Sequence, residues 1–157
     1  MSEGRLDAAL AESVRDVLEK MFFLDLAEPP GDAGRPAGVM AEVTFEGDPP
    51  GTFQLDLDLT AARAAAADFL GEDPDELSVE RTNEVVCELA NMICGSVLSR
   101  VESRAAFRLA TPRIALAGEK LETRAEASFR AAVGEGLLRA EIRMERAACT
   151  GIEKPAS

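Results

Sequence analysis

The sequence contains no histidine, tryptophan or tyrosine, and each absence removes a class of function. Without histidine, the Ser-His and Cys-His pairs of nucleophilic catalysis cannot form, and a zinc site would need an unusual ligand set. Without tryptophan and tyrosine, the chain lacks the usual platform on which single-stranded nucleic acid stacks. A Walker loop, a dinucleotide fingerprint and a nucleophile elbow are also missing.

Long apolar runs and positive charge are scarce as well. No stretch approaches the roughly 18 apolar residues of a membrane span, and the first residues lack the layout of a signal peptide. The formal net charge is −12, so the chain has no electrostatic footprint for a nucleic-acid backbone. We therefore expect a soluble, cytoplasmic protein that binds neither nucleic acid nor a membrane.

The length of 157 residues and the hydrophobic share of 46% predict one globular domain, over residues 1–146, with a frayed tail at 147–157. Of the three cysteines, Cys87 and Cys94 lie seven residues apart on one predicted helix. A rise of about 10 Å separates them, which is too far for a disulfide. We interpret the cysteines, including Cys149, as small hydrophobic residues.

Hydrophobic periodicity predicts helices over residues 6–26, 61–70 and 78–104. Alternating apolar residues predict two β-hairpins, one with strands 39–45 and 53–59, the other with strands 121–133 and 138–144. Hairpins with helices collected on one face give an α+β fold, a two-layer sandwich of helices on an antiparallel sheet.

Several local signals refine this outline. Thr60 is a candidate N-cap for the second helix, and a kink near Ser78 precedes the third. Pro112 predicts an edge strand or extended connection across residues 106–114. Asp56 and Asp58 alternate with apolar residues, so we expect them on the solvated face of the sheet rather than in an acid–base or metal site.

The long helix at 78–104 carries a polar ridge. On a helix that turns roughly 100° per residue, six residues lie within about 80° of one another: Glu84, Glu88, Asn91, Gly95, Ser99 and Glu102. The opposite side is apolar and carries Val85, Val86, Leu89, Ala90, Met92, Ile93 and Val97. A compact polar row above an apolar anchor suits a rigidly held site, but the same pattern also describes an ordinary solvated helix face.

The amide of Asn91 is the most informative group on the ridge. It is neutral, so it can hold a water molecule beside a phosphoryl group without adding like-charge repulsion. Positioning of this kind supplies much of what phosphoryl transfer requires. A carboxylate one turn earlier, at Glu88, can meanwhile pair with a lysine of a partner protein.

The segment Glu88-Leu-Ala-Asn91-Met-Ile-Cys-Gly95, followed later by Pro112, resembles the signature of the CheC/CheX family of chemotaxis phosphatases, most closely the CheX branch. The predicted element order fits the fold of that family, with helices on a long antiparallel sheet. The resemblance implies hydrolysis of the aspartyl phosphate on a CheY-like response-regulator receiver domain. Asn91 would orient the attacking water, and Glu88 would pair with the lysine of the receiver. The Mg²⁺ would belong to the receiver, so we expect no metal or cofactor in this chain.

The same resemblance implies a partner-binding surface around this pair. Gly95 would keep the surface low for close approach, and Glu84 and Ser99 would flank it; in the family Asp or Ser is common at the position of Glu84. Members of the CheC branch carry a second motif on the first helix. Here that stretch is Glu12-Ser-Val-Arg15, with arginine where asparagine would be needed, so we expect a single site. The resemblance to CheX-like proteins also implies that the chain forms a homodimer through sheet edges.

Two other functions remain open at this stage. The same fold could bind a receiver domain or a flagellar-switch protein without hydrolysing anything. Related switch proteins lack the Glu-x-x-Asn pair, which this chain keeps, and this favours the enzyme. A weaker alternative is a structural homodimer whose ridge is only solvated surface.

Overall fold

The computed structural model describes residues 3–22, 24–31, 34, 36, 38–47, 50–101, 107–115 and 125–144. Its helices are α1 (Glu3–Asp16), the π-helix η1 (Val17–Met21) that continues it, α2 (Leu59–Leu70), the 3₁₀-helix η2 (Pro74–Glu76) and α3 (Val79–Val101). Its strands are β1 (Leu26–Ala27), β2 (Gly38–Glu46), β3 (Gly51–Asp58), β4 (Arg108–Leu109), β5 (Arg113–Ile114), β6 (Ala127–Val133) and β7 (Gly136–Met144).

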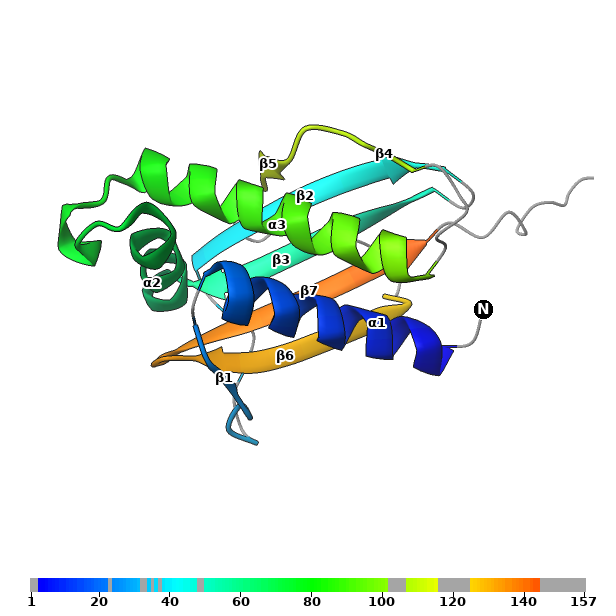
Figure 1. Ribbon diagram of the computed structural model, residues 1–157, viewed down its shortest axis with the longest axis horizontal. Coiled ribbons are helices and arrows are strands. Elements are labelled where there is room, and N and C mark those ends of the chain that lie inside the picture. Colours follow the sequence, from blue (N-terminus) through cyan, green and yellow to red (C-terminus); the bar gives the residue numbers. More distant parts are fainter. Residues whose placement is uncertain are drawn as a thin grey trace, which may run out of the picture.

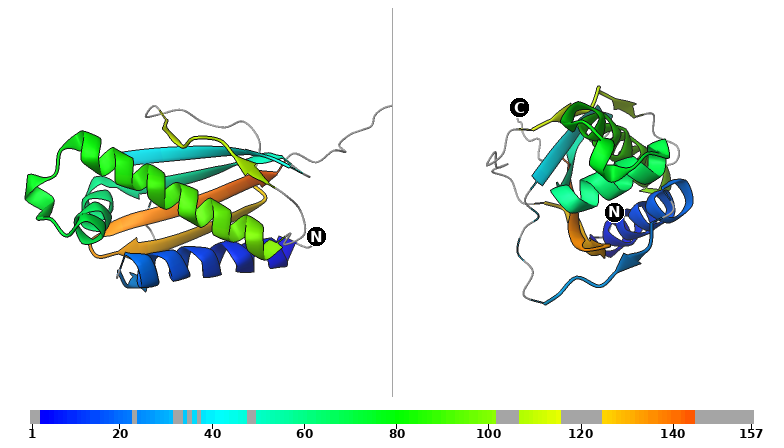
Figure 2. Two further views of the ribbon diagram at one scale, coloured as in Figure 1. Left: turned by 45° about the horizontal axis from the view of Figure 1, so that its top comes forward. Right: turned by 90° about the vertical axis from the view of Figure 1, so that its left-hand side faces the viewer.

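The strands form one antiparallel sheet in the order β1-β6-β7-β3-β2-β4, and β5 also pairs with β2. Helices α1 and α3 lie side by side across one face of this sheet, while α2 lies near one end of α3 (Figure 1). The views in Figure 2 show the helices on one side and the curved sheet on the other. The predicted two-layer α+β fold is therefore confirmed. Among the residues described, no helix is both long and apolar enough to span a membrane.

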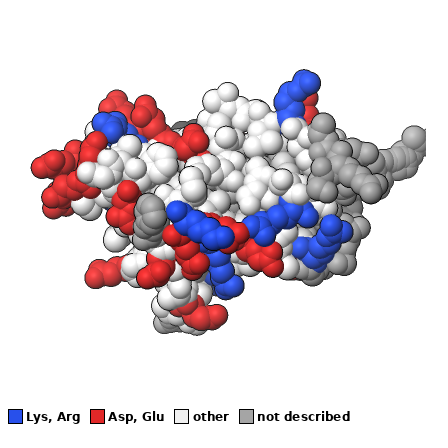
Figure 3. All heavy atoms as spheres, viewed as in Figure 1, with Lys and Arg blue, Asp and Glu red and all other residues white. Residues whose placement is uncertain are grey.

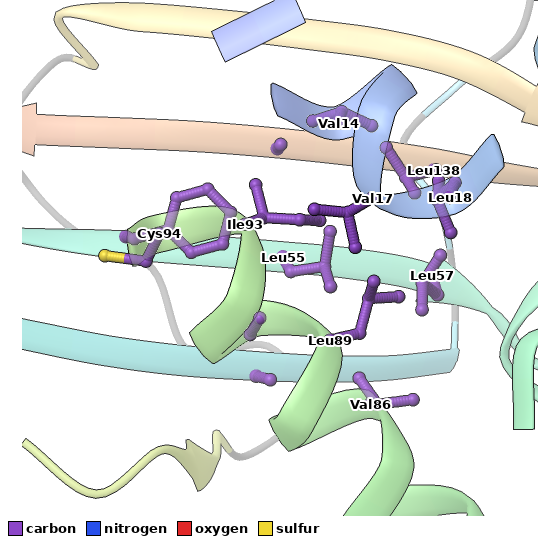
Figure 4. Packing of buried hydrophobic residues seen from close by; sticks show 14 of the residues in the cluster. Val14, Val17, Leu18, Leu55, Leu57, Val86, Leu89, Ile93, Cys94 and Leu138 are labelled. Atoms are coloured by element: carbon purple, nitrogen blue, oxygen red, sulfur yellow. The ribbon is translucent and has the colours of Figure 1, made fainter. Parts of the chain in front are cut away.

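The core lies between the helix layer and the sheet. The register places Leu55 of β3 opposite Ala41 of β2 and Ala140 of β7, so alternate residues of the central strands point toward the helices. Figure 4 shows side chains from α1, η1, α3 and the sheet meeting in this layer, among them Val14, Leu18, Leu55, Leu57, Leu89, Ile93 and Leu138. All seven are nearly or fully inaccessible to solvent.

The predicted hairpins are confirmed as β2–β3 and β6–β7, and β4 and β5 flank Pro112 at the sheet edge as expected. The kink before the third helix is also confirmed, because η2 ends at Glu76 and α3 begins at Val79. The hydroxyl of Ser78 accepts a hydrogen bond from the Arg81 amide at 3.0 Å, which caps the new helix. Residues 102–104, 121–124 and 145–157, including the predicted tail, lie outside the described residues.

Three local predictions are wrong. The first helix ends at Met21 rather than near residue 26, and the two-residue strand β1 follows it. The second helix begins at Leu59, so Asp58 rather than Thr60 takes the N-cap position. The carboxylate of Asp58 accepts a hydrogen bond from the Leu137 amide at 2.9 Å, a contact with β7 that local sequence does not encode.

The third error concerns the outer face of the sheet. Asp56 is only 4% exposed rather than solvated, and it accepts a hydrogen bond from Gln54 at 3.1 Å. The register places Asp56 opposite Arg139, while Glu141 forms ion pairs with Arg139 and Arg143. Long side chains of neighbouring strands thus replace water around these carboxylates.

The buried side of α3 generates a first prediction. Leu89 is fully buried, so Leu89→Ala should lower the free energy of unfolding by about 2–5 kcal/mol through lost contacts and a cavity. The matched control is Val79→Ala on the same helix, where the side chain is 67% exposed. That change should stay within about 0.5 kcal/mol. Urea unfolding measures both, and equal effects would show that this face of α3 does not anchor the helix.

Candidate functional site

The candidate site lies on α3, which is anchored by a continuous buried stripe. The helix packs against α1, α2 and β2. Ten of its residues are buried: Thr82, Val85, Val86, Leu89, Ala90, Ile93, Cys94, Val97, Leu98 and Val101. Because this stripe is fixed on three sides, the rotation of α3 about its own axis is fixed as well. The residues on the opposite side are therefore presented in a defined direction.

The predicted ridge lies on that opposite side. Glu84, Glu88 and Ser99 are exposed, and Asn91 and Gly95 are half-buried. The structure thus brings together five of the six ridge residues, while Glu102 lies outside the described residues. Their spacing of three or four residues places them in one line along the helix surface.

Glu88 and Asn91 are one helical turn apart, and the two residues between them, Leu89 and Ala90, are fully buried. Within the part of the chain that the structure describes, neither polar side chain forms a hydrogen bond or an ion pair. A carboxylate and an amide are thus held on a rigid backbone with their bonding capacity unused. That arrangement suits contact with groups brought by a partner.

The chain provides little other chemistry near this pair. Among the described residues, no three Asp, Glu or Cys side chains come together in a way that could hold a metal ion. The nearby thiol of Cys94 is fully buried, and burial raises its pKa to about 12, so it does not form a thiolate near neutral pH. Burial also raises the pKa of the half-buried Cys87. The interpretation of both as small hydrophobic residues is confirmed, and Cys149 lies outside the described residues.

Gly95 is not required by packing inside the protein. A β-carbon at this position would meet no atom of the described residues within 4 Å. Glycine in a helix interior is less favourable than alanine by about 0.5–1 kcal/mol, so the chain gives up some stability here without an internal reason. The result is a stretch of low helix surface one turn beyond Asn91, open to close approach from outside.

The first helix carries no second copy of this arrangement. Arg15, which stands where a second asparagine would be needed, lies over the ring of Phe129 at 5.5 Å. Glu12 forms an ion pair with Arg100 of α3 at 3.0 Å. Both residues are thus engaged by other parts of the same chain.

Sequence reasoning missed the contact between α1 and α3 that borders the ridge. The Ser96 hydroxyl bonds to Ser13 at 3.0 Å, and Arg100 reaches both Glu12 and Asp16. More than eighty residues separate the two sides, so no local pattern could have revealed these pairs. Figure 3 shows the result as a strip of mixed charge along α1, whereas acidic side chains predominate at the end near α2.

The open surface at Gly95 generates a second prediction. Gly95→Ala should raise the free energy of unfolding by about 0.5–1 kcal/mol, because alanine favours the helix and meets no neighbour. Gly71→Ala is the contrasting control, since Gly71 adopts a φ of 69° after α2, and alanine should be destabilising there. Urea unfolding measures both. A loss of stability in Gly95→Ala would mean that the fold itself needs this glycine.

Comparison with known proteins adds two findings. The family model described as "Chemotaxis phosphatase CheX" matches residues 39–135. The chain also resembles the crystal structure of CheX from Desulfovibrio desulfuricans, with 19% identity, coverage of 89% of this chain and 99% of that one, and a TM-score of 0.71. It resembles CheX from Vibrio vulnificus with 24% identity, coverage of 92% of this chain and 99% of that one, and a TM-score of 0.71. A further match is CheX of Borrelia burgdorferi in a CheX–CheY–BeF₃–Mg²⁺ complex, with 21% identity, coverage of 87% of this chain and 96% of that one, and a TM-score of 0.62. These structures share the fold, and the curated protein sequences contain no match.

Proposed function

Since the chain belongs to the CheX family of chemotaxis phosphatases, we propose that it hydrolyses the aspartyl phosphate of a CheY-like response-regulator receiver domain. The observation that carries this proposal is the pair Glu88 and Asn91. They lie on one outward face of an anchored helix, without a hydrogen bond or ion pair to the described part of the chain. Such a pair completes a site in another protein rather than forming one by itself.

Each ridge residue receives a role from its chemistry. The Asn91 amide orients the attacking water at the phosphoryl group, where a neutral side chain avoids repulsion. The carboxylate of Glu88 pairs with a receiver lysine and sets the register of the two proteins. Gly95 allows the receiver to approach the helix backbone, while Glu84 and Ser99 border the contact.

The receiver supplies the remaining chemistry. We propose that Mg²⁺ is held by the receiver and that this chain contributes no cofactor. In the Borrelia burgdorferi complex, CheX, CheY, BeF₃ and Mg²⁺ occur together, so a CheX protein and the ion are parts of one assembly. We also place the protein in the cytoplasm, where a phosphorylated receiver would be available to it.

The decay of a phosphorylated receiver provides the test. The wild-type protein should accelerate this decay, and Asn91→Ala should lose about 100-fold or more of the acceleration, since the water loses its orienting group. Asn83→Ala is a matched control, because it removes an amide from the same helix away from the ridge.

Glu88→Gln should weaken receiver binding more than it lowers the maximal rate.

Two results would contradict the catalytic role. One is a wild-type protein that accelerates the decay of no cognate receiver; the other is an Asn91→Ala variant as active as the Asn83→Ala control. If the receiver still binds but its dephosphorylation rate is unchanged, the protein is a non-catalytic module for a receiver or a flagellar-switch protein. A pull-down that returns only the chain itself would point to a structural homodimer.

We further propose that the chain forms a homodimer through a sheet edge. The strand β1 pairs with β6 only at Val133 and Ala132. Among the described strands, β1 covers only these two residues on this side of β6. An edge of this kind is available for pairing with a second copy.

The molar mass in solution tests this assembly. Light scattering on a size-exclusion column should give twice the chain mass of 16.7 kDa. The value should hold as the sample is diluted through the micromolar range, because pairing of two sheet edges buries backbone hydrogen bonds. A mass of one chain at all concentrations would rule the dimer out.

A further inference from the structure

A cluster of polar side chains joins α1 to α3 beside the ridge. The guanidinium of Arg100 forms ion pairs with Glu12 at 3.0 Å and with Asp16, and it lies 3.4 Å from the Ser96 hydroxyl. Ser96 in turn bonds to Ser13, which is fully buried. We call Arg100, Glu12, Asp16 and Lys20 the seam cluster, since Lys20 also pairs with Asp16 at 3.7 Å.

The cation of this cluster lies closer to the candidate site than its residue number suggests. Arg100 is nine residues beyond Asn91, but its side chain turns back along the helix to reach Ser96. The guanidinium therefore lies beside the residue that follows Gly95. Along the helix axis this is about 7–8 Å beyond Asn91, on the flank of α3 that lies roughly 140° further round the helix and faces α1.

The seam cluster is electrically balanced, whereas the other end of the ridge is not. Two cations, Arg100 and Lys20, face two carboxylates, Glu12 and Asp16. On the other side of Asn91, the exposed carboxylates are Glu80, Glu84 and Glu88. None of these three forms an ion pair with the described part of the chain. Among the described residues of α3, the surface is thus acidic before Asn91 and electrically balanced after it.

We propose that Arg100 is a positioning residue for the phosphorylated receiver, an inference that rests on the proposed function. By neutralising Glu12 and Asp16, it gives the negatively charged phosphoryl group an unopposed approach over Asn91 and Gly95. The acidic half of the ridge meets the receiver lysine at the same time. This charge difference along α3 fixes the orientation in which the receiver docks.

Charge variants separate this role from a purely structural one. Arg100→Gln leaves the seam cluster with one excess negative charge, whereas the double variant Glu12→Gln/Asp16→Asn leaves two excess positive charges. Both variants remove the same ion pairs between α1 and α3. A structural link would respond to both in the same direction, and a charge effect would respond in opposite directions.

Arg81→Gln is the matched control. Arg81 lies ten residues before Asn91 on the same helix and pairs with Glu72 at 3.0 Å. Its loss changes the net charge of the chain by the same amount. Its side chain reaches back toward Glu72, away from Asn91, so the charge is lost far from the site.

The experiment measures KM and kcat for dephosphorylation of the receiver. It also measures the Kd for a receiver loaded with beryllofluoride and Mg²⁺, and the melting temperature of each variant. At low ionic strength, Arg100→Gln should raise KM and Kd about threefold with kcat unchanged, as expected for one unscreened charge at this range. The double variant Glu12→Gln/Asp16→Asn should lower both KM and Kd. The double variant Glu12→Gln/Arg100→Gln leaves Lys20 facing Asp16, so the cluster is again neutral and KM and Kd should return to wild-type values. Salt at 0.5 M, roughly three times the ionic strength at which the Debye length is about 8 Å, should abolish the differences between the variants.

Several outcomes would overturn the inference while leaving the proposed function intact. One is that the wild type is active but Arg100→Gln and Arg81→Gln change KM and Kd by the same amount. Another is that both seam variants weaken binding together with the melting temperature, which is the signature of a structural link. A wild-type protein that neither binds nor dephosphorylates the receiver refutes the proposed function first, and this inference with it.

Discussion

The burial of one side of α3 is the constraint on which the other features depend. Leu89, Ala90, Ile93 and Cys94 are all fully buried between the helix layer and the sheet. Rotation of the helix by one residue would bring a ridge carboxylate into this core, and a buried unpaired charge is far too unfavourable for that to occur. The apolar stripe therefore determines where the amide of Asn91 points, although it takes no part in any chemistry itself.

The surroundings of α3 then determine what can reach the ridge. The contacts of Ser96 with Ser13, and of Arg100 with Glu12 and Asp16, close the side that faces α1. No side chain in the described part of the protein fills the space above Gly95, so these residues leave the helix backbone accessible there. A rigid, outward-facing row with unused hydrogen-bonding groups is complementary to a preformed site in another protein. Under the proposed function, this is how a chain without histidine contributes to the chemistry of a phosphatase.

Much of the fold could be predicted because its signals are local. Alternating residues indicated β2, β3, β6 and β7, and Pro112 indicated the broken edge strand between β4 and β5. The errors arose where a distant contact overrides a local preference. Asp58 bonds to Leu137 of β7, Asp56 is enclosed by side chains of neighbouring strands, and β1 is too short to show any periodicity.

By itself, the sequence determined the ridge. The spacing of Glu84, Glu88, Asn91, Gly95 and Ser99 is a property of helix geometry, and the motif from Glu88 to Gly95 indicated the family. Only the tertiary structure decided that Glu88 and Asn91 remain without partners in the described chain, that Arg15 lies on Phe129, and that Arg100 balances the charges of α1. The physical reason is that helix periodicity acts over a few residues, whereas charge balance and open space depend on segments that meet only after folding.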